Sequence, residues 1–161
     1  MDKITQQRIL GLHPELQAEV IALVNQANAQ LTKHSEIRIT QGLRTFEEQS
    51  ALYNQGRTTA GNKVTNAKAG QSFHNYGLAF DFCLLIDDKE VSWDNTKDWD
   101  GDKIADWMEV VNIFRKAGWD WGGTWKFKDT PHLQKVYGYT WQQLLEKYNN
   151  KDFISGSYVR I

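Results

Sequence analysis

The chain of 161 residues carries 19 Lys and Arg residues against 20 Asp and Glu residues, a formal net charge of −1. This balance leaves no broad positive surface for a phosphate backbone, so we expect no nucleic-acid partner. The only cysteine, Cys83, excludes an intrachain disulfide, and no segment approaches the roughly 18 apolar residues of a membrane span. The length favours a single domain over residues 1–161, built around one hydrophobic core.

The first half of the chain predicts two helices, a strand and a long loop. Apolar residues at helical spacing behind Pro14 predict a helix over residues 14–33. Residues 36–40 alternate like a strand. Thr45 and Glu48 match a capping box, which predicts a helix from Phe46 to Asn54. Residues 56–71 are rich in Gly, Thr, Asn and Lys and predict a loop, and loops of this length in compact domains are usually functional.

The second half predicts short strands separated by two helices. Residues 78–84 form an apolar strand whose other face carries Asp81 and Cys83. A helix is expected over residues 104–118, a strand with a glycine turn over 119–125, an extended segment over 131–134 and a helix over 141–148. This order predicts an α+β fold with a small, mainly antiparallel sheet and packed helices.

Polar residues in two separate segments suggest a metal site. In SFHNYGLAFDF, His74 precedes Asp81 by seven residues, and Gly77 allows the chain to turn between them. His132 lies in the extended segment DTPHLQ, three residues after Asp129. Two imidazoles and one carboxylate are a ligand set of catalytic zinc sites. Zinc lowers the pKa of a water molecule, and Asp129 would move the proton to a leaving amine. The remaining histidines, His13 and His34, are expected at the surface.

The motif S-x-H-x-x-G-x-A-x-D, formed by Ser72, His74, Gly77, Ala79 and Asp81, resembles the signature of the zinc D-Ala-D-Ala peptidases and the hedgehog domain. Within this group the chain is most similar to peptidoglycan L-alanyl-D-glutamate endopeptidases, over about residues 12–145. The resemblance implies the same compact α+β fold and the zinc ligands His74, Asp81 and His132. It also implies that Asp129 is the catalytic acid/base.

The resemblance further implies roles for three polar residues. Arg44 matches an arginine that stabilises the charged transition state, a role in which a fixed cation is most effective. Gln49 and Ser72 match polar residues beside the metal and the substrate. Trp125, the tryptophan nearest the DTPH segment, is our candidate for a wall of the substrate groove. Each residue also has a simpler interpretation. Arg44 would form a surface ion pair, and Ser72 would cap a turn. Gln49 would lie on a solvated helix face, and Trp125 would lie in the core.

An acidic segment, DWDGDKIADWME, suggests a second cation site. Carboxylates stand at about positions 1, 3, 5, 9 and 12 of an EF-hand-like loop, which favours calcium; they are Asp98, Asp100, Asp102, Asp106 and Glu109. The pattern departs from that loop at its sharp turn, where Lys103 replaces glycine. The alternative is that Asp102 is the N-cap of the following helix.

These observations predict a zinc metallopeptidase acting on peptidoglycan stem peptides, as an endolysin or cell-wall hydrolase. One alternative is a D,D- or L,D-carboxypeptidase on the same scaffold, for which Arg57 or Lys63 would bind the terminal carboxylate. A second is a metal-bound binding module without activity, which would not need Asp129 and Arg44. The first residues lack the apolar core of a signal peptide. We therefore expect a monomer made in the cytoplasm that acts on the cell wall.

Overall fold

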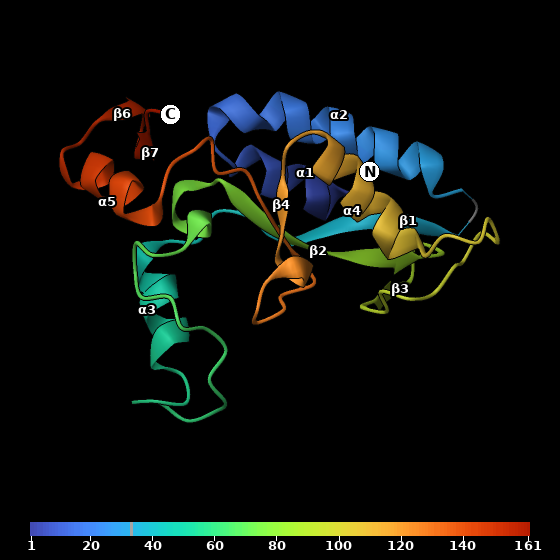
Figure 1. The fold of residues 1–161 in the computed structure, drawn as a ribbon, viewed down its shortest axis with the longest axis horizontal. Helices are drawn as coiled ribbons and strands as arrows, with labels where there is room; N and C mark the ends of the chain where they lie inside the picture. Colours follow the sequence, from blue (N-terminus) through green and yellow to red (C-terminus); the bar gives the residue numbers. More distant parts are fainter. Residues whose placement is uncertain (33) are drawn as a thin grey trace.

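The computed structural model describes residues 1–32 and 34–161. Five α-helices accompany a five-stranded sheet and a separate two-stranded hairpin (Figure 1). The large sheet has the order β1-β2-β5-β4, with β3 also pairing with β2, and every pairing is antiparallel. The predicted α+β class with a mainly antiparallel sheet is therefore confirmed.

The helices and strands follow one another along the chain with short connections. The helices are α1 (Lys3–Leu10), α2 (Pro14–Gln30), α3 (Phe46–Asn54), α4 (Asp106–Lys116) and α5 (Trp141–Asn149). The strands of the large sheet are β1 (Ser35–Gln41), β2 (Ala79–Ile86), β3 (Glu90–Ser92), β4 (Asp120–Trp121) and β5 (His132–Gln134). The hairpin consists of β6 (Phe153–Ser155) and β7 (Tyr158–Val159), and two short 3₁₀ helices span Phe73–Tyr76 and Gly122–Thr124. Each helix is too short or too polar to cross a lipid bilayer, as far as the described chain extends.

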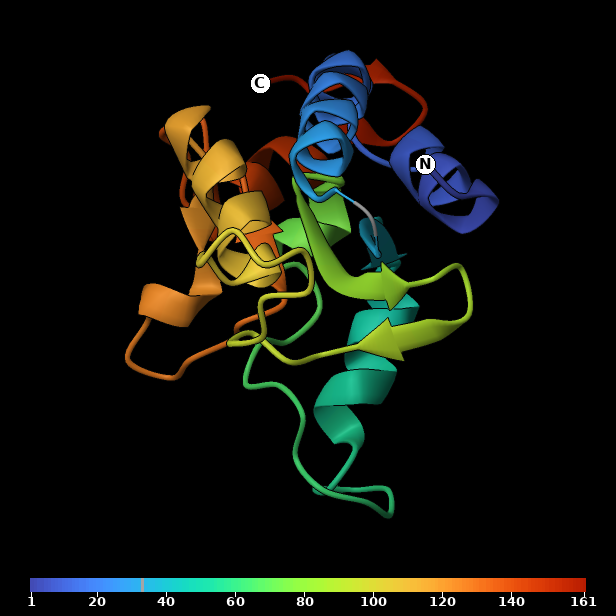
Figure 2. The same cartoon turned by 90° about the vertical axis from the view of Figure 1, so that its right-hand side faces the viewer.

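The core lies between the large sheet and the helices α1, α2 and α4, which share one side of it (Figures 1 and 2). Phe80, Phe82 and Leu84 of β2 point into this core, as the alternation predicts, together with Trp107 and Phe114 of α4. The helix α3 and the following loop extend away on the other side of the sheet. This arrangement leaves the polar side of β2 facing the loop.

Local signals set most element boundaries. The capping box is present at Thr45, whose hydroxyl accepts from the backbone N–H of Glu48, and α3 has the predicted bounds. The helix α2 begins at Pro14 as expected and ends at Gln30; the last residue of the predicted helix, Lys33, lies outside the described residues. The helix α4 begins at Asp106 with Ala105 as its N-cap and without a side-chain cap, so the alternative that Asp102 caps it is wrong.

The helix α1, the strand β3, the β6–β7 hairpin and the two 3₁₀ helices were not predicted. The helix α1 has few apolar residues and depends on Asp2, whose carboxylate accepts from the N–H groups of Ile4 and Thr5. The hairpin packs against the beginning of α2, where the Nε2 atom of His13 lies 2.8 Å from the carbonyl oxygen of Val159. His13 is buried. Its expected surface location is therefore wrong, because a strand 146 residues away covers it.

Candidate metal centre and active site

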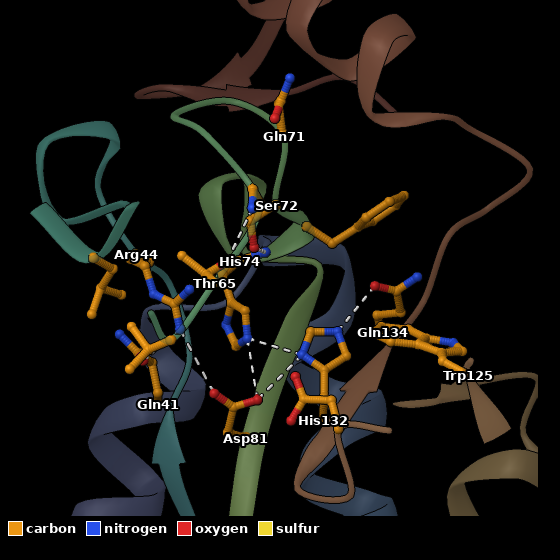
Figure 3. A pocket seen from close by; sticks show the side chains of 15 residues that line it. Gln41, Arg44, Thr65, Gln71, Ser72, His74, Asp81, Trp125, His132 and Gln134 are labelled. Atoms are coloured by element: carbon orange, nitrogen blue, oxygen red, sulfur yellow. Dashed lines mark hydrogen bonds and ion pairs between the residues drawn. The ribbon is translucent and has the colours of Figure 1, made fainter. Parts of the chain in front are cut away.

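An open cavity of about 380 Å³ lies over the polar side of β2. Its walls come from β1, the loop after α3, the first 3₁₀ helix and the segment between β4 and β5 (Figure 3). Seven of the predicted site residues line it: Arg44, Ser72, His74, Asp81, Trp125, Asp129 and His132. These residues come from distant segments of the chain, and they share one cavity.

The three predicted metal ligands converge at the base of this cavity. Asp81 and His132 are paired in register on β2 and β5. His74 reaches them from the 3₁₀ helix, whose last residue is followed by Gly77 with φ of 69°. A Cβ atom at Gly77 would lie 2.6 Å from the backbone nitrogen of His13, so only glycine fits this turn. The turn therefore places a histidine from outside the sheet beside a carboxylate within it.

The ligand atoms have the spacing that a tetrahedral ion requires. Nε2 of His74 lies 3.3 Å from Oδ1 of Asp81 and 3.2 Å from Nδ1 of His132 (Figure 3). Nδ1 of His132 lies 3.2 Å from the same Asp81 oxygen. Ligands bound tetrahedrally at roughly 2.0–2.1 Å from zinc lie about 3.3 Å from one another. The three distances therefore match those between ligands of one zinc ion.

Hydrogen bonds on the far side of each ring favour the tautomers that zinc binding needs. Nδ1 of His74 lies 2.7 Å from the carbonyl oxygen of Gly42, and Nε2 of His132 lies 3.0 Å from Oε1 of Gln134. Each of these ring nitrogens donates, which leaves the nitrogen facing Asp81 without a proton. Three electron-pair donors then meet at one point. A cation relieves their mutual repulsion, so the residues present fit a zinc ion.

The ionised form of the Asp81 side chain is strongly favoured at this position. Burial acts to raise the pKa of Asp81, but in the metal-free triad the hydrogen bonds and charges that protonated His132 and His74 rings supply outweigh it and hold the pKa far below its usual range. The other oxygen of Asp81 lies 3.7 Å from Nη2 of Arg44. The carboxylate is therefore ionised and available to a metal.

Arg44 is held beside the triad by two glutamine side chains. Its Nη1 donates to Oε1 of Gln49 at 2.9 Å, and its Nη2 donates to Oε1 of Gln41 at 2.6 Å. Its backbone N–H donates to the carbonyl oxygen of His74. Burial lowers the pKa of Arg44 and the charges of Asp81, Glu48 and Asp129 oppose this, so the guanidinium is a fixed, mostly buried cation.

Gln49 lies behind Arg44 and not on a solvated helix face, so that simpler interpretation of Gln49 is wrong. It is fully buried, it is absent from the cavity wall, and its amide donates to the carbonyl oxygen of Ala67. It links Arg44 to the loop and does not itself face a substrate. Gln41 and Gln134, which hold Arg44 and His132, were not predicted; only the position of Gln134 on the same strand face as His132 could have indicated one of them.

Asp129 lies on the exposed side of the triad. Its backbone N–H donates to the carbonyl oxygen of Gly122, where a Cβ atom would come within 2.4 Å of the Asp129 carbonyl oxygen. Gly122 therefore allows this close packing. Burial and the charge of Asp81 raise the pKa of Asp129, against the charges of His132, His74 and Arg44. Its carboxylate accepts no hydrogen bond from the described residues, so it is available to act on a proton.

Ser72 lies beside His74, and Trp125 lies beside His132. The hydroxyl of Ser72 accepts from the N–H of His74 at 3.3 Å, so it caps the 3₁₀ helix and also lines the cavity. Trp125 remains 38% exposed, and its ring centre lies 5.0 Å from that of His132. Figure 3 shows it beyond His132 and Gln134. Both positions are compatible with the predicted contacts to substrate.

The cations proposed for a carboxypeptidase lie elsewhere. Nη1 of Arg57 donates to the carbonyl oxygens of Tyr53 and Thr65, and its guanidinium stacks on the ring of Tyr53. Lys63 is exposed. Neither lines the cavity, and Arg44 is the only Lys or Arg among the described residues that do.

The acidic segment forms a separate cluster. One carboxylate oxygen from each of Asp98, Asp100 and Asp106 lies within 4.8 Å of the others, and the same holds for Asp100, Asp102 and Glu109. The structure thus brings all five predicted residues into two overlapping groups.

Comparison with known proteins places the chain among peptidases. Residues 65–135 match the M15 peptidase model described as D-alanyl-D-alanine carboxypeptidase. The peptidoglycan L-alanyl-D-glutamate endopeptidase CwlK of Bacillus subtilis is 46% identical over 126 residues, which cover 78% of this chain and 74% of that protein. The crystal structure of the Serratia marcescens L-Ala D-Glu endopeptidase ChiX shares 25% identity and a TM-score of 0.55, over 85% of this chain and 90% of that one. The extent of these matches, together with the His-Asp-His triad, shows that the chain belongs to the M15 family of metallopeptidases.

Proposed function

We propose that this chain is a zinc-dependent endopeptidase that cuts the bond between L-alanine and D-glutamate in peptidoglycan stem peptides. The observation that carries the proposal is the convergence of three ligand atoms, each 3.2–3.3 Å from the others, beside Asp129 and Arg44 in one open cavity. The choice of bond is supported by the activities for which the two relatives, CwlK and ChiX, are named.

His74, Asp81 and His132 would hold the zinc ion. Bound there, zinc acts as a Lewis acid that activates water and polarises an amide carbonyl group. Asp129 takes a proton from the attacking water and delivers it to the leaving nitrogen. Its carboxylate accepts no hydrogen bond from the described residues, and its raised pKa is closer to neutral pH than that of an ordinary aspartate. Arg44 stabilises the negative charge that develops on the substrate oxygen, because Gln41 and Gln49 hold its guanidinium in place before the reaction.

The cavity favours an endopeptidase over a carboxypeptidase. A carboxypeptidase needs a cation that binds the terminal carboxylate of its substrate. Arg44 already faces Asp81 and two glutamines, while Arg57 is engaged by its own loop. The cavity is open, with Val64 and Thr65 of the long loop on its wall and Trp125 also lining it. A peptide that continues beyond the cleaved bond in both directions fits this surface.

The free carboxylate of Asp129 argues against a binding module without activity. Metal binding requires the triad and its supporting hydrogen bonds, and these do not include Asp129. A carboxylate with a raised pKa, without a hydrogen-bond donor among the described residues, has no structural role there. An acid/base role accounts for it.

Digestion of intact peptidoglycan, followed by mass spectrometry of the new termini, tests the proposal. We expect peptides that begin with D-glutamate, and L-alanine left on the muramic acid. The Asp129→Asn variant should give no such products, while Asp120→Asn, which changes an exposed carboxylate on β4, should retain full activity. Free D-alanine as the main product would instead establish a carboxypeptidase on the same metal site.

We further propose that residues 1–161 act as one domain, as a monomer at the cell wall. The continuous core that joins the large sheet to α1, α2 and α4 supports the single domain. Light scattering on the purified protein should give a mass near 18.6 kDa; a dimer mass would contradict the monomer.

A further inference from the structure

The acidic loop, as we call residues 98–109, comprises the end of the connection from β3 to α4 and the first turn of α4, and its connecting part lies at the right of Figure 1. Its carboxylates form the two groups described above, which share Asp100. The donors are all oxygen atoms, and hard cations prefer such donors. A cluster of acids on a surface loop is common without any ion, so the contacts of each carboxylate decide whether a cation fits.

Most of these carboxylates already have structural partners. Asp98 accepts from the N–H groups of Gly101 at 2.6 Å and Lys103 at 2.8 Å, and Asp102 accepts from the N–H of Ile104 at 2.7 Å. Asp100 accepts from the hydroxyl of Thr32 at 2.8 Å. These contacts fold the loop without a metal.

Asp106 also has a structural role. One of its oxygens accepts from the N–H of Trp99 at 2.8 Å, and the other accepts from the hydroxyl of Ser35 on β1. Asp106 is fully buried, so it fixes the loop and the start of α4 to the sheet. Its two oxygens are occupied.

Glu109 is different. It is only 1% exposed, and neither of its carboxylate oxygens has a hydrogen-bond partner of normal geometry among the described residues. One of these oxygens lies within 4.8 Å of carboxylate oxygens of Asp100 and Asp102. No described residue forms an ion pair with it. A buried carboxylate directed at two other carboxylates is unfavourable unless a cation joins them.

The electrostatics of Glu109 agree with this geometry. Burial raises its pKa, the charges of Asp102, Asp100 and Asp106 raise it further, and the side chain of Gln30 only partly offsets them. Protonation of Glu109 would remove one charge and give it a proton to donate, but the negative charges of Asp100 and Asp102 beside it would remain. A divalent cation supplies positive charge and binds the oxygens of Glu109.

The backbone of the loop has the shape that the spacing requires. Gly101 and Lys103 both have positive φ, of 87° and 79°. Lys103 occupies the sharp-turn position at which the sequence pattern departed from an EF-hand-like loop. A left-handed conformation in a non-glycine residue is unfavourable by itself, yet the turn forms at this position. Lys103 therefore adopts the left-handed backbone conformation that glycine has at this position of an EF-hand-like loop.

We propose that the acidic loop is a calcium site in which Glu109, Asp100 and Asp102 provide the side-chain oxygens. Asp98, whose two oxygens accept from the N–H groups of Gly101 and Lys103, holds the loop in shape. Asp106 supports the site through Ser35 and Trp99 and is not needed as a ligand. Calcium suits a flexible set of several carboxylates, whereas magnesium demands a near-ideal octahedron. The site is independent of the proposed peptidase function.

Calorimetry of the zinc-loaded chain in calcium-free buffer tests the proposal. Calcium at ten times its dissociation constant should raise the Tm by about 3–6 °C, because it binds only the folded state. Magnesium at the same concentration should give a smaller shift. Terbium, which replaces calcium, should show luminescence sensitised by Trp99 within the loop, and calcium should remove it. If calcium leaves the Tm of the wild-type chain unchanged, the proposal is wrong.

The Glu109→Gln variant separates a calcium ligand from a structural side chain. Without calcium, this variant should melt at a higher temperature than the wild type, because a neutral amide can donate to Asp100 and Asp102. Its calcium response and terbium signal should be lost. The control Asp88→Asn changes an exposed acid outside the loop and should keep both responses. A full calcium response in Glu109→Gln would overturn the proposal. Zinc content and peptidoglycan hydrolysis, measured on the same samples, report separately on the peptidase function.

Discussion

The zinc triad and the acidic loop bring together groups that bind cations, but they do so in different ways. The triad is assembled by long-range pairing: β2 and β5 place Asp81 opposite His132, and a glycine turn adds His74. The acidic loop is shaped mainly by contacts within a short segment, in which its carboxylates accept from nearby N–H groups. Thr32 and Ser35 then tie Asp100 and Asp106 to the rest of the fold. The triad is therefore organised before the metal binds, whereas the loop retains one buried carboxylate, Glu109, without a hydrogen bond of normal geometry from any described residue.

The two sites therefore use the binding energy of an ion in different ways. In the triad, Gly42 and Gln134 satisfy the far nitrogens of both histidines, so little ordering is needed when the ion enters. In the acidic loop, the ion itself supplies the missing partner of a buried carboxylate. We therefore expect zinc to be needed for hydrolysis and calcium to raise the stability of the folded chain.

The largest expected effect follows removal of a triad ligand. His74→Ala or His132→Ala should lose the zinc ion and reduce hydrolysis to the background level, because a two-ligand site does not retain the metal. The calcium-induced rise in Tm should remain, since the two sites share no ligand. Zinc analysis, peptide release and calorimetry measure the three quantities. His34→Ala, an exposed histidine paired with Asp87, is the control. Normal zinc content in both ligand variants would rule out the assigned triad.

The next effect separates the metal from the acid/base. Asp129→Asn should retain the zinc ion but lose about 10²–10⁴-fold in kcat, because it removes proton transfer and leaves the ligands intact. Metal content and kcat measured on one preparation decide this. Loss of the zinc ion in this variant would make Asp129 a ligand and would contradict its acid/base role.

A smaller effect is expected at the hydrogen bonds that surround the triad. Gln49→Leu removes the acceptor of Arg44 Nη1 and the donor to the Ala67 carbonyl oxygen. We expect a loss of about 10–100-fold in kcat, as for other residues that orient catalytic groups, with about 1–3 kcal/mol less stability. The KM should change little, since Gln49 does not face the substrate. A raised KM with unchanged kcat would restore the predicted substrate contact.

The smallest effect concerns two residues on the same side of β2. Asp81 reaches the cavity, whereas Cys83 is buried, and burial raises the pKa of its thiol to about 11, against the charge of Arg38. Because the thiolate is the reactive form, native protein at a pH of about 8 should resist alkylation by iodoacetamide. Protein unfolded in guanidinium should react fully. Mass spectrometry measures the label, and rapid labelling of the native chain would contradict the burial.

Sequence reasoning succeeded where a residue and its neighbours carry the signal. The capping box at Thr45, the alternation along β2 and the spacing from His74 to Asp81 all depend on local chemistry, and each is present in the structure. It failed where a distant segment decides. Nothing near His13 indicates that Val159 will cover it, and nothing near Gln49 indicates that the carbonyl oxygen of Ala67, 18 residues away, will accept from its amide.

The fold class was predictable for the same reason, because the order of helices and short strands is a local pattern. The helix α1 was not predicted, since its short segment lacks an apolar periodicity and depends on the cap at Asp2. The hairpin β6–β7 was missed because its strands are only two or three residues long.

The contact between His13 and Val159 joins a residue that is synthesised early to one that is synthesised 146 residues later. The backbone N–H of His13 donates to the carbonyl oxygen of Gly77, so this histidine supports the turn that carries His74. During synthesis its imidazole has no acceptor until residue 159 has left the ribosome. We therefore expect the turn that carries His74 to be fully supported only once the hairpin β6–β7 has been synthesised and has folded against His13. A chain truncated before Phe153 should melt at a lower temperature than the full chain, because a buried imidazole then lacks its partner.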